Sequence, residues 1–104
     1  KVDRVNNFWK FLATDPGTHR RTWESIKDIM APGVLDPVTK ELIYIAVSVT
    51  NGCEYCTHSH TAAAVGKGMT PAQHAELLAV IGMANQTNAL VNGLRVPVDE
   101  GLLK

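Results

Sequence analysis

The 104-residue sequence has no excess of charge of either sign, because ten lysines and arginines balance ten aspartates and glutamates. The basic residues are scattered and form no cationic patch, so we expect no nucleic-acid partner. Long hydrophobic runs are also missing. A run such as 42–49 is far shorter than the roughly 20 residues that a membrane-spanning helix needs, so we expect no membrane partner.

The sequence also lacks internal repeats, low-complexity tracts and linkers. Its length is typical of one domain, so residues 1–104 are predicted to form a single domain. Hydrophobic residues make up 45% and charged residues 19%, a balance that excludes a disordered chain. No flavin or nicotinamide motif is present, so we expect no cofactor, and a redox reaction would need electrons from a separate partner.

Cysteine is scarce, and both cysteines, Cys53 and Cys56, fall within four residues. Two cysteines are too few for the disulfide framework of a small secreted protein. A close CxxC pair is instead typical of redox chemistry or metal binding in a reducing compartment, so we expect a cytoplasmic protein.

Proline follows a good helix-capping residue at three places: Asp15-Pro16, Asp36-Pro37 and Thr70-Pro71. Proline suits the first position of a helix because its missing N–H would have no partner there. These pairs predict helices that begin near residues 16, 37 and 71. The second of them is apolar nearly all round over 42–47, so we expect it to be central.

Apolar spacing adds two further helices. One precedes Asp15 and carries Val2, Val5, Phe8, Trp9 and Leu12, and the other runs from 53 to 67 after the turn signal Asn51-Gly52. In the helix from 71, Gly82 and the polar run 85–88 predict a bend or a frayed end, with a short turn near 99–103. The sequence therefore predicts an all-α bundle of about five helices with a central antiparallel hairpin.

The stretch around the two cysteines carries the candidate chemistry. Cys53 and Cys56 stand three apart at a predicted helix start, so they share a face and can form a disulfide. A helix N-terminus presents free N–H groups that stabilise a thiolate. His60 lies four residues after Cys56, one turn along the same face, and a Cys–His pair is a usual means of activating a thiol.

Glu41 is the candidate group that orients the histidine. It lies ten residues before Asn51, about 15 Å along a helix, and His60 lies eight residues after Gly52, about 12 Å along the returning helix. The two residues therefore lie at nearly the same level of the hairpin. This predicts a chain of contacts from Glu41 through His60 to Cys56 and Cys53, provided that Glu41 faces the returning helix.

Glu41, eleven intervening residues and then Cys53-x-x-Cys56-x-x-x-His60 resemble the AhpD-like branch of the carboxymuconolactone decarboxylase superfamily over residues 36–68. The resemblance implies an all-α fold that assembles as a homo-oligomer, a trimer or hexamer. It implies a peroxidase that reduces hydroperoxides with an external dithiol or protein reductant. Glu41, Cys53, Cys56 and His60 would take the catalytic positions, and the cysteines would cycle between dithiol and disulfide.

From the contact expected with His60, we hypothesise that Cys56 attacks the peroxide and that Cys53 then closes the disulfide, with the reverse order left open. Better-studied relatives have a histidine directly before the second cysteine, where this chain has Tyr55. One alternative is a carboxymuconolactone decarboxylase-like acid–base enzyme that uses Glu41 and His60.

Another alternative is a non-catalytic module that binds a metal or assists assembly. Cys53, Cys56, His58 and His60 are all potential zinc ligands, and a structural zinc site needs four. On one continuous helix, however, His58 points away from the face of Cys56 and His60. We therefore predict no metal site within one chain.

Overall fold

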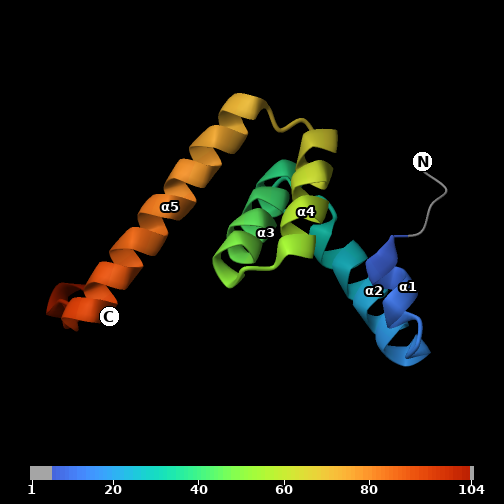
Figure 1. Ribbon diagram of the computed structural model, residues 1–104, viewed down its shortest axis with the longest axis horizontal. Helices are drawn as coiled ribbons and strands as arrows, with labels where there is room; N and C mark the ends of the chain where they lie inside the picture. The colour runs from blue at the N-terminus through green and yellow to red at the C-terminus, as the bar shows by residue number, and fades with distance from the viewer. Residues whose placement is uncertain (1–5, 104) are drawn as a thin grey trace. The chain divides into compact units, whose positions relative to one another are not determined.

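The computed structural model describes residues 6–103, and this part of the chain contains five α-helices, one short 3-10 helix and no strand (Figure 1). The all-α prediction is confirmed. Val2 and Val5, predicted on the first helix, lie outside the described residues. The elements are α1 (Asn7–Leu12), α2 (Pro16–Met30), α3 (Pro37–Asn51), α4 (Glu54–Gly66), α5 (Pro71–Leu94) and the 3-10 helix η1 (Glu100–Leu102).

The chain divides into two compact units, one ending at Pro37 and the other beginning at Val38. In the first unit, α2 begins where predicted, because the Asp15 side chain accepts a hydrogen bond from the backbone N–H of Thr18. The ring of Trp9 on α1 meets the ring of Trp23 on α2 edge to face, with centroids 5.1 Å apart. A single domain over residues 1–104 stays a prediction.

In the second unit, α3 and α4 form the predicted antiparallel hairpin (Figure 1). Gly52 makes the turn with a φ of 71°, a left-handed conformation that glycine adopts without strain. The N–H of Gly52 donates to the Val49 carbonyl and the N–H of Cys53 donates to the Ser48 carbonyl. These two bonds close α3 as a Schellman motif, so α4 can begin at the next residue.

The core of the second unit lies between the hairpin and the start of α5. Ile45 and Ala64 are fully buried, Met69 is nearly so, and Leu42, Val49 and Leu77 pack against them. Helix α3 was expected to be central, and it contributes Leu42, Ile45 and Val49 to this core, but one side of it is not covered within the chain. Ile43 and Val47 are 49% and 54% exposed, because α4 and α5 contact a different side of α3.

Helix α5 begins at a capping box formed by Thr70 and Gln73 and continues without a break to Leu94. The predicted bend or fraying at Gly82 and 85–88 is therefore wrong. Part of the polar run bonds back onto the helix, since Thr87 and Asn88 both donate to the carbonyl of Ala84. The turn predicted near 99–103 is present as η1. Within residues 6–103, no helix has the length and apolar character needed to cross a membrane.

Candidate functional site

Cys53 caps the N-terminus of α4. Its Sγ accepts a hydrogen bond from the backbone N–H of Cys56, with sulfur and nitrogen 3.3 Å apart. The two cysteines approach each other to 3.0 Å, and both are free thiols. The sulfur of Cys53 therefore lies at the end of a helix where unpaired N–H groups and the helix dipole stabilise negative charge.

The pKa values of the two thiols are shifted in opposite directions. A hydrogen bond from the Cys56 thiol, supported by the backbone N–H of Cys56, lowers the pKa of Cys53. Giving up that proton is unfavourable for the donor, so the same bond, with burial and the charge of Cys53, raises the pKa of Cys56 to about 11. The lowered pKa therefore belongs to Cys53, whereas the order hypothesised from the spacing to His60 has Cys56 as the attacking thiol.

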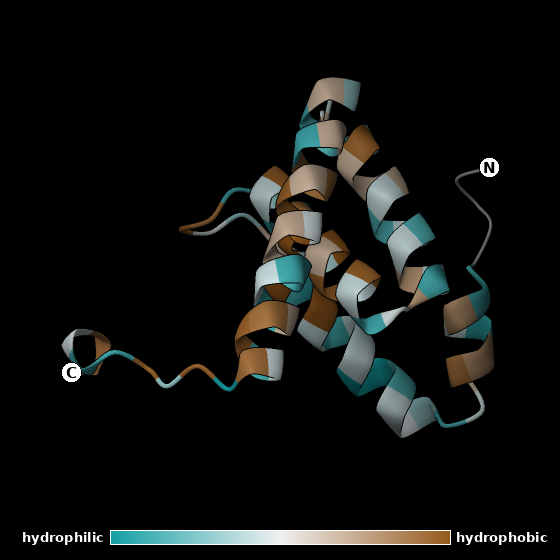
Figure 2. Ribbon diagram, turned by 60° about the vertical axis from the view of Figure 1, so that its left-hand side comes forward, coloured by the Kyte–Doolittle hydropathy of each residue, from teal (hydrophilic) through white to brown (hydrophobic). Residues whose placement is uncertain are grey.

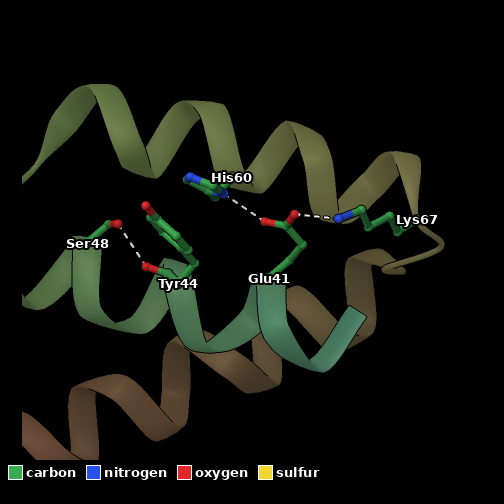
Figure 3. Close-up of polar contacts among 5 residues, drawn as sticks. All are labelled: Glu41, Tyr44, Ser48, His60 and Lys67. Atoms are coloured by element: carbon green, nitrogen blue, oxygen red, sulfur yellow. Dashed lines mark hydrogen bonds and ion pairs between the residues drawn. The ribbon is translucent and has the colours of Figure 1, made fainter. Parts of the chain in front are cut away.

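Glu41 faces α4, which is the condition under which its contact with His60 was predicted. The residue is 3% exposed, and its Oε1 lies 2.7 Å from Nδ1 of His60 (Figure 3). A carboxylate only accepts, so Nδ1 is the donor in this contact, and Nε2 is the ring nitrogen left to exchange a proton with another group. The predicted contact between Glu41 and His60 is confirmed.

Lys67 also contacts the buried carboxylate, which the sequence analysis did not anticipate. Its Nζ donates to Oε2 of Glu41 at 2.7 Å, so both oxygens of Glu41 are bound (Figure 3). A buried carboxylate needs such partners to offset its lost hydration. Helical spacing could have predicted this contact, because Lys67 lies seven residues after His60 and hence two turns along the same face of α4.

Tyr44 is a second neighbour of His60, and its contact with the histidine was not predicted from the sequence. Its ring stacks on the imidazole with centroids 3.6 Å apart and planes 19° apart. Burial raises the pKa of Tyr44, and the negative charges of Cys56, Glu41 and Cys53 raise it further. Tyr44 lies three residues after Glu41, so helical spacing places both residues on the face of α3 that meets α4.

The remaining link of the predicted chain stays a prediction. Among residues 6–103, no hydrogen bond joins His60 to either cysteine. The described residues also contain no group of three histidine, cysteine, aspartate or glutamate side chains arranged to hold a metal ion. His58 is exposed on α4.

Comparisons with known proteins show which family and which solved structure this chain is similar to. The model of the carboxymuconolactone decarboxylase family matches residues 16–99. The crystal structure of the alkylhydroperoxidase AhpD core from Rhodospirillum rubrum is 61% identical in sequence, with a TM-score of 0.95. The match covers 98% of this chain and 76% of that one. A comparison with curated proteins gave no match.

Proposed function

The chain belongs to the carboxymuconolactone decarboxylase family as an AhpD-like member, and on that premise we propose that it is a thiol-dependent hydroperoxide reductase. Its substrates would be an organic hydroperoxide and an external dithiol or protein reductant. The similar AhpD core is described as an alkylhydroperoxidase, which supports the same chemistry here.

One observation carries the proposal. Cys53 caps α4 and accepts hydrogen bonds from both the N–H and the thiol of Cys56, so a cysteine with a lowered pKa stands beside a second cysteine whose pKa is raised. The thiolate is the nucleophilic form of cysteine. A neighbouring thiol within 3.0 Å can then close a disulfide with little movement. A thiolate beside a resolving thiol is the arrangement that two-electron peroxide reduction requires.

In the proposed reaction, the Cys53 thiolate attacks the terminal oxygen of the hydroperoxide. The sulfur is oxidised to a sulfenic acid, the O–O bond breaks, and the alkoxide takes up a proton to leave as an alcohol. Cys56 then attacks the Cys53 sulfur, forming the disulfide and releasing water. An external dithiol restores both thiols by exchange.

His60 and Glu41 act in the second half of this sequence. Oxidation removes the negative charge of Cys53 and weakens the hydrogen bond that the Cys56 thiol donates to it. Both are causes of the raised pKa of Cys56, so this pKa should fall after oxidation. In the proposed reaction, Nε2 of His60, which lies one turn along α4, takes the proton as Cys56 attacks. The carboxylate of Glu41 holds the imidazole in the required tautomer.

The alternative acid–base activity would use the Glu41–His60 pair, which is formed independently of the cysteines. The two functions differ in their need for sulfur. The test is consumption of an organic hydroperoxide with a dithiol present, measured for the wild type and for Cys53→Ala, Cys56→Ala, His60→Ala and Glu41→Gln.

We expect the cysteine variants to lose turnover and the His60 and Glu41 variants to slow it by about 10²-fold or more. The double variant of His60 and Glu41 should resemble the slower single variant, because Glu41 acts through His60. His58→Ala, an exposed histidine on the same helix, should match the wild type. Hydroperoxide consumption that is unchanged in Cys53→Ala would refute the proposed function.

A further inference from the structure

The hydroperoxide reaction needs an acid for its leaving group, and the proposed function does not yet assign one. Breaking the O–O bond releases an alkoxide, a strong base that leaves readily only if a proton reaches it. The other side-chain donors drawn in Figure 3 each make a hydrogen bond, although the ammonium of Lys67 keeps further N–H groups. Nδ1 of His60 and Nζ of Lys67 donate to Glu41, and the Ser48 hydroxyl donates to the Tyr44 carbonyl at 2.8 Å (Figure 3).

The hydroxyl of Tyr44 differs from these donors. Among the five residues drawn in Figure 3, it is the side-chain donor that makes no hydrogen bond to the described chain. Its oxygen is not a buried group lacking a partner either, since residues 6–103 contain none, so it is open to solvent or to a ligand. The hydroxyl is therefore available to a molecule that enters the site.

The position of Tyr44 directs this hydroxyl toward the N-terminal half of α4, the half that carries Cys56. The ring lies flat against His60, which fixes its orientation. Figure 3 shows the phenolic oxygen beyond the imidazole, on the side of the N-terminal half of α4, away from Glu41 and Lys67. Cys56 occupies that part of α4, one turn before His60, with Cys53 at its cap. Burial and the charges of Cys56, Glu41 and Cys53 raise the pKa of Tyr44, so the phenol stays protonated.

We propose that Tyr44 is a catalytic acid whose hydroxyl protonates the alkoxide released from the hydroperoxide, an inference that rests on the proposed function. The Cys53 thiolate forms the S–O bond, the O–O bond breaks, and the alkoxide takes the proton of Tyr44. An alkoxide is a stronger base than a phenolate, so the transfer is favourable. The phenolate then takes a proton from water, which replaces the proton lost when the thiol ionised.

Tyr44→Phe tests this role because it keeps the ring against His60 and removes only the hydroxyl. The measured quantity is the single-turnover rate of the reduced protein with an alkyl hydroperoxide and with a peroxy acid. A carboxylate is a good leaving group that needs no acid. We expect the rate with the alkyl hydroperoxide to fall about 10²-fold, with little change for the peroxy acid. Alkylation of Cys53 by iodoacetamide, which requires no proton, should also be unchanged.

Ser48→Ala is the matched control, since it removes a hydroxyl from the same helix that is already bonded within that helix. It should leave the ratio of the two peroxide rates as in the wild type. Equal losses with both peroxides in Tyr44→Phe would show a structural effect and overturn the proposal. If Tyr44→Phe reacts like an active wild type, the acid role is wrong and the proposed function stands. If the wild type does not react with hydroperoxide, both the acid role of Tyr44 and the proposed function are wrong.

Discussion

Cys53 and Cys56 differ in their surroundings although only two residues separate them. Cys53 lies at the cap of α4, where its sulfur accepts hydrogen bonds, and Cys56 lies in the first turn, where its thiol donates one. A thiolate at Cys53 is stabilised by these donors, whereas a thiolate at Cys56 would lose its bond and stand beside a like charge. The difference in pKa between the two thiols therefore depends on their mutual contact, and the pKa of each should change when the other cysteine is removed.

This mutual dependence predicts how each thiol titrates alone. In Cys56→Ala, the pKa of Cys53 should rise because the thiol donor is lost, yet stay below that of an ordinary cysteine because the backbone N–H of residue 56 remains. In Cys53→Ala, the pKa of Cys56 should fall from about 11, because only burial continues to raise it. The pH dependence of iodoacetamide alkylation, followed by peptide mass spectrometry, measures both. Alkylation profiles of the remaining thiol that match those in the wild type would contradict the paired account.

Lys67 is expected to contribute to stability through the buried carboxylate of Glu41. Lys67→Met leaves that carboxylate with His60 as its side-chain partner, and removing one member of a buried pair is costly. Because the Lys67 side chain is itself 36% exposed, we expect a loss of about 2 kcal/mol in the free energy of unfolding rather than more.

The control for Lys67 is Lys27→Met, which removes an exposed ion pair with Glu24 at 3.3 Å. Its cost should be below about 1 kcal/mol. Urea unfolding followed by circular dichroism compares the two variants. Equal losses would mean that the buried position of Glu41 adds nothing to the interaction.

Counting residues from the turn was enough to predict that Glu41 and His60 lie at one level, because the rise of a helix is fixed. Counting residues could not predict which thiol has the lower pKa. That depends on which sulfur caps the helix and on which thiol donates the hydrogen bond between them. It also missed Lys67 and Tyr44. Both are spaced from predicted site residues by whole turns, so a systematic search at three, four and seven residues would have found them.

At the scale of elements, the turn at Gly52 determines where the cysteines lie. Its positive φ allows the chain to close α3 and cap α4 within two residues. Gly52→Ala adds a Cβ that meets no atom within 4 Å, so its cost is conformational alone, about 1 kcal/mol. Gly82→Ala is the matched control, because that site is also open but lies inside α5, where alanine stabilises a helix by about 0.5–1 kcal/mol. Denaturant midpoints that shift in the same direction for both variants would contradict this explanation of the turn.

The helix starts could be predicted because a capping residue before proline acts locally, and α2, α3 and α5 each begin at the proline. The continuity of α5 could not be predicted. Glycine, asparagine and threonine, which make up most of this stretch's polar run and its glycine, are poor helix formers, but propensity is weak beside the cooperativity of a long helix with a good cap. Side-chain bonds to the Ala84 carbonyl reinforce this stretch.

In the whole molecule, helix α5 exposes much apolar surface. We propose that other copies of the chain cover this surface in a homo-oligomer, a trimer or hexamer. Only Ile81 of the 24 residues of α5 is buried. Figure 2 shows apolar segments along this helix, including its C-terminal end. Exposed apolar patches of this kind mark protein interfaces. The apolar residues of α5 that are more than 40% exposed are Leu78, Val80, Met83, Leu90, Val91 and Leu94.

Light scattering at micromolar concentration should therefore give the mass of three or six chains. Leu90→Lys places a charge on this surface and should lower the measured mass. Asn92→Lys, two positions along the helix and on its opposite side, should leave the mass unchanged. A monomer mass for the wild type would contradict assembly through α5.

The central claim is that the cysteine pair reduces hydroperoxides and that Cys53 reacts first. It is tested most directly by adding one equivalent of an organic hydroperoxide to the reduced protein and mapping its peptides by mass spectrometry with a sulfenic-acid trap present. The account predicts one alcohol released per chain and a Cys53–Cys56 disulfide in the wild type. Cys56→Ala should stop at a trapped sulfenic acid on Cys53. Free thiols at both positions after hydroperoxide treatment of the wild type would contradict the account.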